Sequence, residues 1–247
     1  MQLHRLYKKR LTLPDSTMAL LLHIDTATEQ ASVCLSRDAS ILGLISSSEQ
    51  KNHAGFVQPA IQELMQTNGC SLTELDAVSV TAGPGSYTGL RVGMATAKGI
   101  CYALQKPLIL VNTLEVMARA MLTELEAGGL PAPDTWLCPM IDARRMEVFT
   151  AWYDLSLTEI QPPQALILEA GCFDEMLGKR PVFFGGSGHT KLKMLLNSPN
   201  ASFSHSLHTA ANLAVLALKY FRIGRFANLA YSEPLYVKEF FNPVKKV

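Results

Sequence analysis

Two stretches of this chain repeat one design, and that internal repeat constrains the fold more than any other feature. Residues 24–35 and 141–152 each begin with an apolar strand ending in Ile-Asp, pass through a short polar turn and enter a second strand rich in β-forming residues. A strand, a glycine turn and a helix also recur, as AVSVTAGPGSYTGL and later as PVFFGGSGHTKL. The repeat predicts two copies of one α/β unit, forming two lobes that face each other across a cleft.

The remaining patterns give the order of elements around these landmarks. In the first half we expect helices over about residues 54–67 and 86–104, a capped turn at 71–74, and strands over 77–82 and 107–113. A helix over about residues 209–222 closes at Gly224 and leads into an extended tail. The stretch 126–135, rich in Gly and Pro, is the best candidate for a linker or loop.

These patterns divide the chain into three segments. Residues 1–17 form an extension before Met18, residues 18–117 form the first lobe, and residues 118–247 form the second lobe with the C-terminal helix and tail. The predicted fold class is therefore α/β, with two duplicated lobes around a cleft.

The composition indicates a globular protein without a dominant charge. A formal net charge of +1 argues against a surface built mainly to neutralise nucleic-acid phosphates, but it is compatible with a local basic patch. The five cysteines are widely spaced and contain no C-x-x-C, which fits neither a disulfide framework nor a zinc site. The apolar run MALLLHID is too short for a signal peptide. We expect a cytoplasmic protein with free thiols and no membrane association.

Two aspartates at strand ends are the candidates for holding a metal and nucleotide phosphates across the cleft. Asp25 and Asp142 occupy equivalent places in the repeat. The alternative is that each carboxylate bonds the backbone of its own tight turn. The turn after Asp25 is Thr-Ala-Thr, and Ala27 stands where close approach of a phosphate usually needs glycine. This favours the structural alternative.

The loop that begins at Gly83 resembles a phosphate-binding loop without matching a known pattern. No G-x-x-x-x-G-K-[ST] frame fits, and Thr88 takes the place of the last glycine of G-x-G-x-x-G. A helix N-terminus after a glycine turn can still bind an anion through its unpaired N–H groups. We therefore predict a vestigial nucleotide or phosphate cleft whose members are Asp25, Thr26, Gly83, Gly85, Ser86, Asp142, Gly185 and Gly186.

The helix behind this loop carries small residues at regular spacing. Gly89, Gly93 and Ala97 fall at i, i+4 and i+8, which forms a smooth stripe where another helix can approach closely. Because glycine within a helix costs up to about 1 kcal/mol relative to alanine, the stripe indicates close packing. Packing within the chain is the default explanation, and a partner's helix is the alternative.

Metal-binding and hydrolytic patterns are weak. His53 lacks a second histidine one turn later, because the fourth residue on is Val57. His205 and His208 lie in a polar stretch without an obvious third ligand, and spacing reveals no nucleophilic triad. We predict neither a bound metal nor a catalytic residue.

The stretches LLHIDTATEQASVCL, GPGSYTGLRVGMATAKGICYAL, IDARRMEVF and EPLYV resemble the bacterial TsaB (YeaZ) family. The resemblance runs from about residue 18 to residue 237. It implies the ASKHA fold of actin, sugar kinases and Hsp70-like ATPases, with two duplicated ribonuclease-H-like lobes. Met146, where relatives often have glycine, departs from the family pattern and argues against close phosphate approach in the second lobe.

The resemblance also implies a function. TsaB proteins are non-catalytic scaffold subunits that pair with their paralogue TsaD to make N6-threonylcarbamoyladenosine beside the anticodon of tRNAs reading codons that begin with A. The implied partners are TsaD, the ATPase TsaE and, only through the complex, tRNA. No cofactor is implied, and weak ATP binding stays open. The alternatives are an ATP-dependent kinase or ATPase of this superfamily and, less favoured, a metallopeptidase of the wider family.

The resemblance further implies that the helices over residues 54–67 and 86–104 form the partner surface. The interface candidates are Phe56, Ala60, Leu64, Leu90, Gly93, Met94, Ala97 and Lys98. Arginine at Met94 or Ala97 is expected to weaken pairing with TsaD and to leave the monomer folded. The isolated chain is expected to form a C2 homodimer through the same face.

Overall fold

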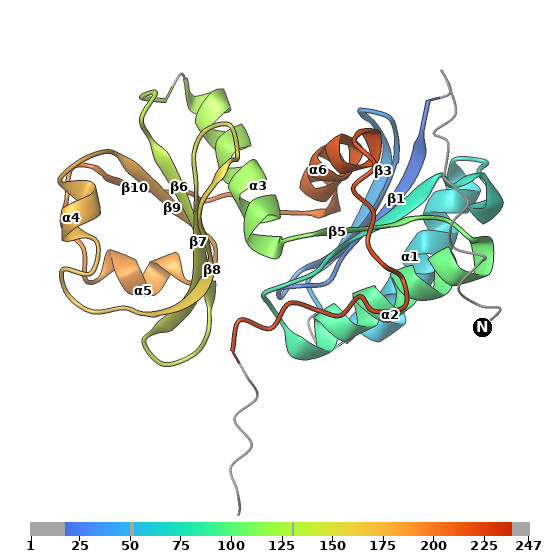
Figure 1. Ribbon diagram of the computed structural model, residues 1–247, viewed down its shortest axis with the longest axis horizontal. Coiled ribbons are helices and arrows are strands. Elements are labelled where there is room, and N and C mark those ends of the chain that lie inside the picture. The colour runs from blue at the N-terminus through green and yellow to red at the C-terminus, as the bar shows by residue number, and fades with distance from the viewer. Residues whose placement is uncertain (1–17, 50–51, 130, 239–247) are drawn as a thin grey trace, which may run out of the picture.

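Each half of the chain forms a five-stranded mixed sheet, as the computed structural model shows for residues 18–49, 52–129 and 131–238 (Figure 1). The first sheet has the order β3-β2-β1-β4-β5 and consists of β1 (Leu20–Asp25), β2 (Ala31–Arg37), β3 (Ser40–Ser47), β4 (Ala77–Thr81) and β5 (Leu108–Val111). β1 pairs antiparallel with β2 and parallel with β4. The extension predicted over residues 1–17 lies outside the described residues.

The second sheet repeats this topology. Its order is β10-β9-β6-β7-β8, and it consists of β6 (Trp136–Asp142), β7 (Glu147–Tyr153), β8 (Glu159–Ile167), β9 (Val182–Gly185) and β10 (Ala201–Phe203). β6 pairs antiparallel with β7 and parallel with β9, as β1 does with β2 and β4. The predicted fold class, two duplicated α/β lobes, is confirmed.

Helices cover both faces of each sheet. They are α1 (His53–Thr67), α2 (Tyr87–Leu104), α3 (Thr113–Gly128), α4 (Asp174–Leu177), α5 (His189–Lys193) and α6 (Ala210–Arg222), with a 3-10 turn at Leu72–Glu74. The long predicted helices form within a residue or two of their expected bounds because their caps are local. Ser86 caps α2 and Thr209 caps α6 through side-chain oxygens. The repeat is imperfect in α5, which is much shorter than its counterpart α2.

The two halves of the chain exchange a helix between their sheets. α3 follows β5 but packs mainly on β6 and β7 of the second sheet, whereas α6 follows β10 but packs on β1 and β5 of the first. The expected division between residues 117 and 118 therefore falls inside α3. The predicted linker stretch 126–135 overlaps the end of α3, which runs to Gly128, and its described residues 131–135 form neither helix nor strand. Figure 1 shows α3 and α6 side by side between the sheets, where Tyr220 donates a hydrogen bond to Glu115 over 2.8 Å.

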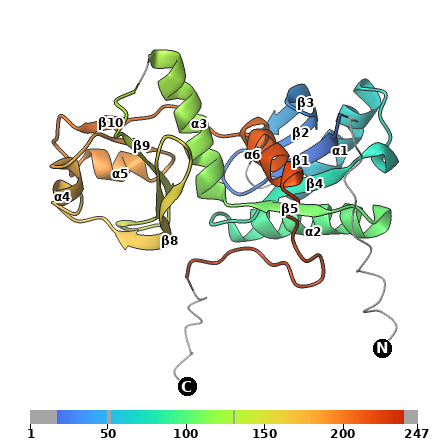
Figure 2. The same cartoon turned by 45° about the horizontal axis from the view of Figure 1, so that its top comes forward.

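The tail after α6 returns across the first lobe and reaches the second. Ala227 N donates to Leu108 O over 2.8 Å, and Leu235 N donates to Ala82 O over 2.6 Å. Lys238 then pairs with Glu147 of β7 over 2.6 Å. Figure 2 shows this path past α2 towards the second lobe. None of the helices in the described part of the chain has the length and apolarity needed to span a bilayer.

The segment that leads from β10 into α6 is fixed by one carboxylate. Glu124 on α3 accepts hydrogen bonds from the hydroxyls of Ser204 and Ser206 and from the backbone N–H groups of His205 and Ser206. Burial acts to raise the pKa of Glu124, but these hydrogen bonds outweigh it and lower the pKa from 4.5 to about 2. The ionised carboxylate thus holds the crossover between the lobes.

The hydrogen bonds to the ionised Glu124 predict that the free energy of unfolding falls in acid. Because the pKa is lower in the folded than in the unfolded state, the ionised Glu124 stabilises the fold above about pH 4.5, and this contribution is lost as the pH falls towards 2. Glu124→Gln is expected to lower the free energy of unfolding at pH 7 by about 1 kcal/mol or more and to flatten its decline in acid. Urea unfolding at pH 7, 5 and 3 measures this, with the exposed Glu126→Gln as the matched control. Parallel pH curves for wild type and Glu124→Gln would refute the assignment.

Candidate functional site

The Asp25 carboxylate at the end of β1 is closed off from solvent. Asp25 is 1% exposed, and its Oδ1 accepts hydrogen bonds from Thr81 Oγ1 at 2.9 Å and Ala27 N at 3.2 Å. Its Oδ2 lies 3.4 Å from Nε2 of His208, which is also buried, and neither of these two atoms has a hydrogen-bond partner among the described residues. The carboxylate therefore bonds β4 and its own turn through Oδ1, and Oδ2 faces the segment before α6. The structural alternative for Asp25 describes its contacts better than a phosphate-binding role does.

The contact with His208 could not be found from the sequence. His208 was considered only as a weak metal ligand beside His205, and it lies in the other half of the chain from Asp25. Neither position carries a local signal for this pairing, since the exchange of α6 between the lobes creates it. Among the residues that the structure describes, no group of three or more His, Cys, Asp or Glu side chains is placed to hold a metal ion.

The predicted glycine loop is filled by the chain's own backbone. A side chain at Gly85 would collide with the carbonyl oxygen of Ala27, and one at Gly89 would collide with that of Thr26. Ser86 N donates to Ala27 O over 2.7 Å. On the other side, a Cβ at Gly83, whose φ is +109°, would lie 2.6 Å from Leu235 O in the tail. These glycines are needed because two other segments press against the loop.

The small-residue stripe of α2 also faces inward. A side chain at Gly93 would collide with Thr26 Oγ1, and that hydroxyl donates to Gly89 O over 2.7 Å. Ala97 is fully buried in the core between α2 and the first sheet. The default explanation, close packing within the chain, therefore holds for this stripe.

The second lobe closes its equivalent loop in the same way. A Cβ at Gly185 would lie 2.7 Å from Met121 Sδ, and one at Gly186 would collide with Met117 Cε. Asp142, in contrast to Asp25, is exposed and accepts a hydrogen bond from Lys191 Nζ over 2.6 Å, which lowers the pKa of its carboxyl group. The two aspartates share no bonding partner among the described residues, so they do not act as a matched pair.

His53, the other residue considered as a metal ligand, is buried. Its Nε2 lies 3.3 Å from Glu29 O, and Val57 one turn later is fully buried in the core. This imidazole joins α1 to the β1–β2 turn.

The interface candidates are mostly on the wrong face of their helices. Ala60, Leu64, Leu90, Gly93, Met94 and Ala97 are all buried against the first sheet, so a partner cannot reach them in this fold. Phe56 is half-buried and packs against the same core, and Lys98 donates from Nζ to Ser232 O of the tail over 2.8 Å. The apolar periodicity of these helices is as predicted, but periodicity alone does not say which helix face is buried.

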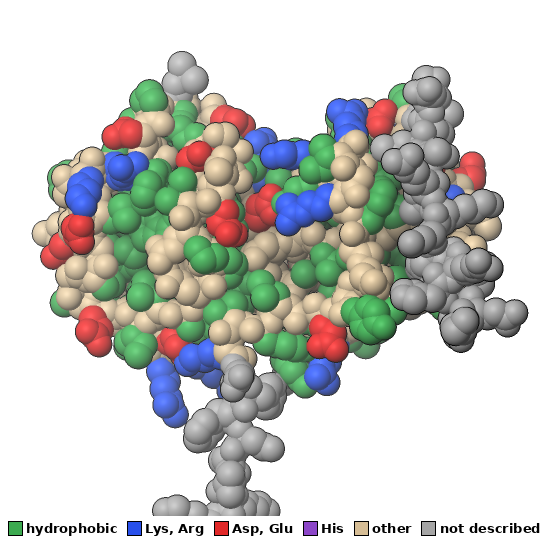
Figure 3. Space-filling model, viewed as in Figure 1, with side chains coloured by type: hydrophobic (Ala, Val, Ile, Leu, Met, Phe, Trp, Pro, Cys, Tyr) green, Lys and Arg blue, Asp and Glu red, His purple; other side chains and the backbone are tan. Residues whose placement is uncertain are grey.

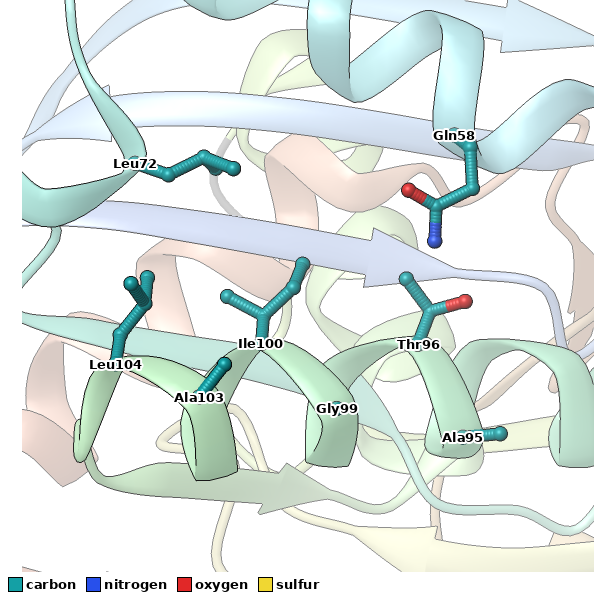
Figure 4. Close-up of a pocket in the computed structure, with 8 residues that line it drawn as sticks. All are labelled: Gln58, Leu72, Ala95, Thr96, Gly99, Ile100, Ala103 and Leu104. Carbon is teal, nitrogen blue, oxygen red and sulfur yellow. The ribbon is translucent and has the colours of Figure 1, made fainter.

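The outward faces of α1 and α2 enclose a groove of about 290 Å³ (Figure 4). Its lining consists of Gln58, Leu72, Ala95, Thr96, Gly99, Ile100, Ala103 and Leu104. Ala95, Gly99 and Ala103 are exposed and form a second stripe of small residues at i, i+4 and i+8. A Cβ at Gly99 would meet no atom within 4 Å, so this stripe is open where the inner one is filled. The sequence shows the spacing of this open stripe as well, but the prediction used only the inner stripe.

The topology defines this chain as a two-lobed α/β protein of the ribonuclease-H-like group. The model of the family TsaD, tRNA N6-adenosine threonylcarbamoyltransferase, matches residues 31–176, which is more than half of the chain. Proteins named tRNA threonylcarbamoyladenosine biosynthesis protein TsaB match from Bacillus subtilis, at 30% identity over 71% of this chain and 74% of that protein, and from Escherichia coli, at 35% identity over 54% of each. The chain belongs to the TsaB (YeaZ) family.

Solved structures agree with this assignment. YeaZ from Pseudomonas aeruginosa has a TM-score of 0.73 at 26% identity, over 89% of this chain and all of that one. A second crystal structure, of a Pseudomonas aeruginosa protein described as similar to the peptidase YeaZ, has a TM-score of 0.75 at 26% identity over 90% of this chain and all of that one. The match to the Escherichia coli relative spans only about half of that protein's length. The structural similarity covers both lobes.

Burial reverses the expected result of two substitutions. Met94→Arg and Ala97→Arg place a charge in the core between α2 and the first sheet, so each is expected to cost more than about 3 kcal/mol and to leave little folded protein. Ala95→Arg, one residue from Met94 on the open face, is expected to keep the wild-type melting temperature within a few degrees. Soluble yield and thermal unfolding by circular dichroism distinguish these variants. A well-folded Met94→Arg protein would show that α2 is rotated from the orientation described.

Proposed function

We propose that this chain is a non-catalytic subunit in the formation of N6-threonylcarbamoyladenosine on tRNA, and that it acts by pairing with a TsaD-type transferase. The names of its relatives place them in threonylcarbamoyladenosine biosynthesis. The family model that matches the chain is that of the transferase itself. A chain that shares the transferase's fold is suited to bind it, since related subunits often associate through equivalent surfaces.

The filled glycine loop supports the non-catalytic part of this proposal. For a phosphate to approach Gly83 and Gly85, the tail at Leu235 and the backbone of Ala27 would have to leave. Oδ1 of Asp25 accepts hydrogen bonds from Thr81 and Ala27, and Oδ2 faces the buried His208 at 3.4 Å, with 1% of the residue exposed. A catalytic carboxylate must touch its substrate or a metal ion. The burial of Asp25 supports a structural role for its carboxylate over a catalytic one.

The open groove between α1 and α2 supports the pairing part. The exposed stripe of Ala95, Gly99 and Ala103 allows a helix of another subunit to approach the α2 backbone closely. Ile100, Leu104 and Leu72 add apolar surface along the groove. We propose that the transferase subunit occupies this groove, and that a second copy of this chain takes its place when the chain is alone. The further partners are a TsaE-type ATPase and tRNA, which bind the complex and not the isolated chain. The complex is proposed to act in the cytoplasm.

The pathway assignment is tested by nucleoside mass spectrometry of tRNA from cells depleted of this protein. We expect threonylcarbamoyladenosine to disappear and to return with the wild-type gene. Asp25→Asn keeps the size and the acceptor oxygen that Thr81 and Ala27 use, so it is expected to restore the modification as well. Unchanged tRNA after depletion would refute the pathway, and failure of a folded Asp25→Asn protein would refute the non-catalytic role.

The pairing surface is tested with substitutions on the open stripe. Ala95→Arg and Ala103→Arg are expected to weaken binding of a purified TsaD-type partner at least tenfold, because each places a long charged side chain in the groove. Val215→Arg, at an exposed apolar position on α6, is the matched control and is expected to bind normally. Calorimetry measures the affinity, and light scattering of each variant alone reports whether a homodimer uses the same surface. Equal affinities for all variants would place the partner elsewhere.

A further inference from the structure

The turn between β6 and β7 holds two arginines in a backbone conformation that suits neither. Arg144 has a φ of +69° and Arg145 a φ of +49°, and both side chains are exposed. Among the described residues they form the only consecutive pair of non-glycine residues with positive φ. Glycine and asparagine adopt this region at little cost, whereas a side chain such as arginine is strained there. Such strain tends to be kept where a side chain has a function.

The charges of the two arginines are left uncompensated by the protein. The turn is flanked by two carboxylates, Asp142 and Glu147, either of which is suited to pair with an arginine. Instead Asp142 binds Lys191 Nζ at 2.6 Å and Glu147 binds Lys238 Nζ at 2.6 Å. Within the described part of the chain, neither guanidinium has an ion-pair partner. Both nearby carboxylates therefore pair with lysines, and the two guanidinium groups remain free to bind a ligand.

Apolar side chains lie next to this turn. Met146 and Ile167 are both exposed, and Leu168 N donates to Met146 O over 2.6 Å, which holds the end of β8 against the turn. The tail also arrives here through Lys238. Figure 3 shows basic side chains gathered at the end of the second lobe where the tail arrives. The surface therefore combines free guanidinium groups with exposed apolar side chains.

We propose that the Arg144–Arg145 turn is a contact for the phosphate backbone of RNA. Guanidinium forks match phosphate oxygens in a bidentate geometry, and exposed apolar side chains beside them offer contact to an unstacked base. The proposal rests on the proposed function, because it names the place where this subunit touches the tRNA that the complex modifies. With a net charge of +1 for the whole chain, the contact is local and adds to the affinity that the other subunits supply.

Direct binding tests the proposal on the full chain in complex with a purified TsaD-type transferase, because tRNA is proposed to join that complex. The probe is a fluorescein-labelled, unmodified tRNA transcript that reads a codon beginning with A, followed by anisotropy across a salt series. The double variant Arg144→Ala/Arg145→Ala is expected to bind at least tenfold more weakly at low salt and to reduce the slope of log affinity against log salt by about 1.4 to 1.8. The matched control Lys219→Ala/Arg222→Ala removes the same charge from α6 and is expected to change affinity less than twofold. A wild-type complex without salt-dependent binding, or an equal loss in both double variants, overturns the proposal.

A second variant separates binding from folding. Arg144→Asn/Arg145→Gly removes both guanidinium groups and places residues that accept left-handed backbone at both positions, so it is expected to raise the melting temperature by about 4 °C. The same protein is expected to lose RNA binding as the alanine variant does. Retained binding overturns the proposal. Polyglutamate of matched charge serves as a competitor, and displacement of the tRNA at equal concentration would assign the turn to an acidic protein surface instead.

The outcomes separate this inference from the function on which it rests. If depletion abolishes threonylcarbamoyladenosine but the arginine variants bind RNA normally, the inference alone fails. If depletion leaves the modification unchanged, the proposed function fails whatever the binding data show. Loss of binding together with a lowered level of modification in cells that carry the arginine variants supports both.

Discussion

The close packing of the β1–β2 turn against the start of α2 is the contact on which the first lobe depends. The carbonyl oxygens of Thr26 and Ala27 occupy the space that side chains at Gly89 and Gly85 would take, and Thr26 Oγ1 donates to Gly89 O. Backbone can approach backbone this closely only where the Cβ is missing. The same contact fixes α2 on the sheet, caps the glycine loop and removes the space a phosphate would need.

The exchange of α3 and α6 makes the two lobes one cooperative unit. Each helix buries its apolar face on the sheet of the other half, and the two meet through Tyr220 and Glu115. The segment into α6 is held by Glu124, and the residue before its cap, His208, closes over Asp25. A motion that opens the space around Asp25 must therefore move α6. This coupling is consistent with the proposed non-catalytic role.

Two stripes of small residues on α2 serve opposite purposes. The inner stripe is filled by the turn after β1, whereas Ala95, Gly99 and Ala103 face an open groove. Charges at the β6–β7 turn are also paired selectively. Lysines pair with Asp142 and Glu147, whereas Arg144 and Arg145, which lie between them in the sequence, have no ion-pair partner among the described residues. A helix groove on one lobe and an unpaired cationic turn on the other suit a subunit that joins a protein partner and an RNA.

The sequence by itself determined the elements whose signals are local. The repeated Ile-Asp strands and the apolar periodicity predicted the duplicated α/β lobes and the helices α1, α2 and α6, whereas α3 was not predicted. Ala27 favoured a structural role for Asp25, and Ala27 N donates a hydrogen bond to Asp25 Oδ1. Only the tertiary structure decided which face of α2 is buried. Two stripes of small residues on α2 have the same i, i+4 and i+8 spacing, so spacing alone does not say which of them packs on the sheet. The tertiary structure also decided the partner of Asp25 and the exchange of helices, since these contacts join residues that no spacing along the chain relates.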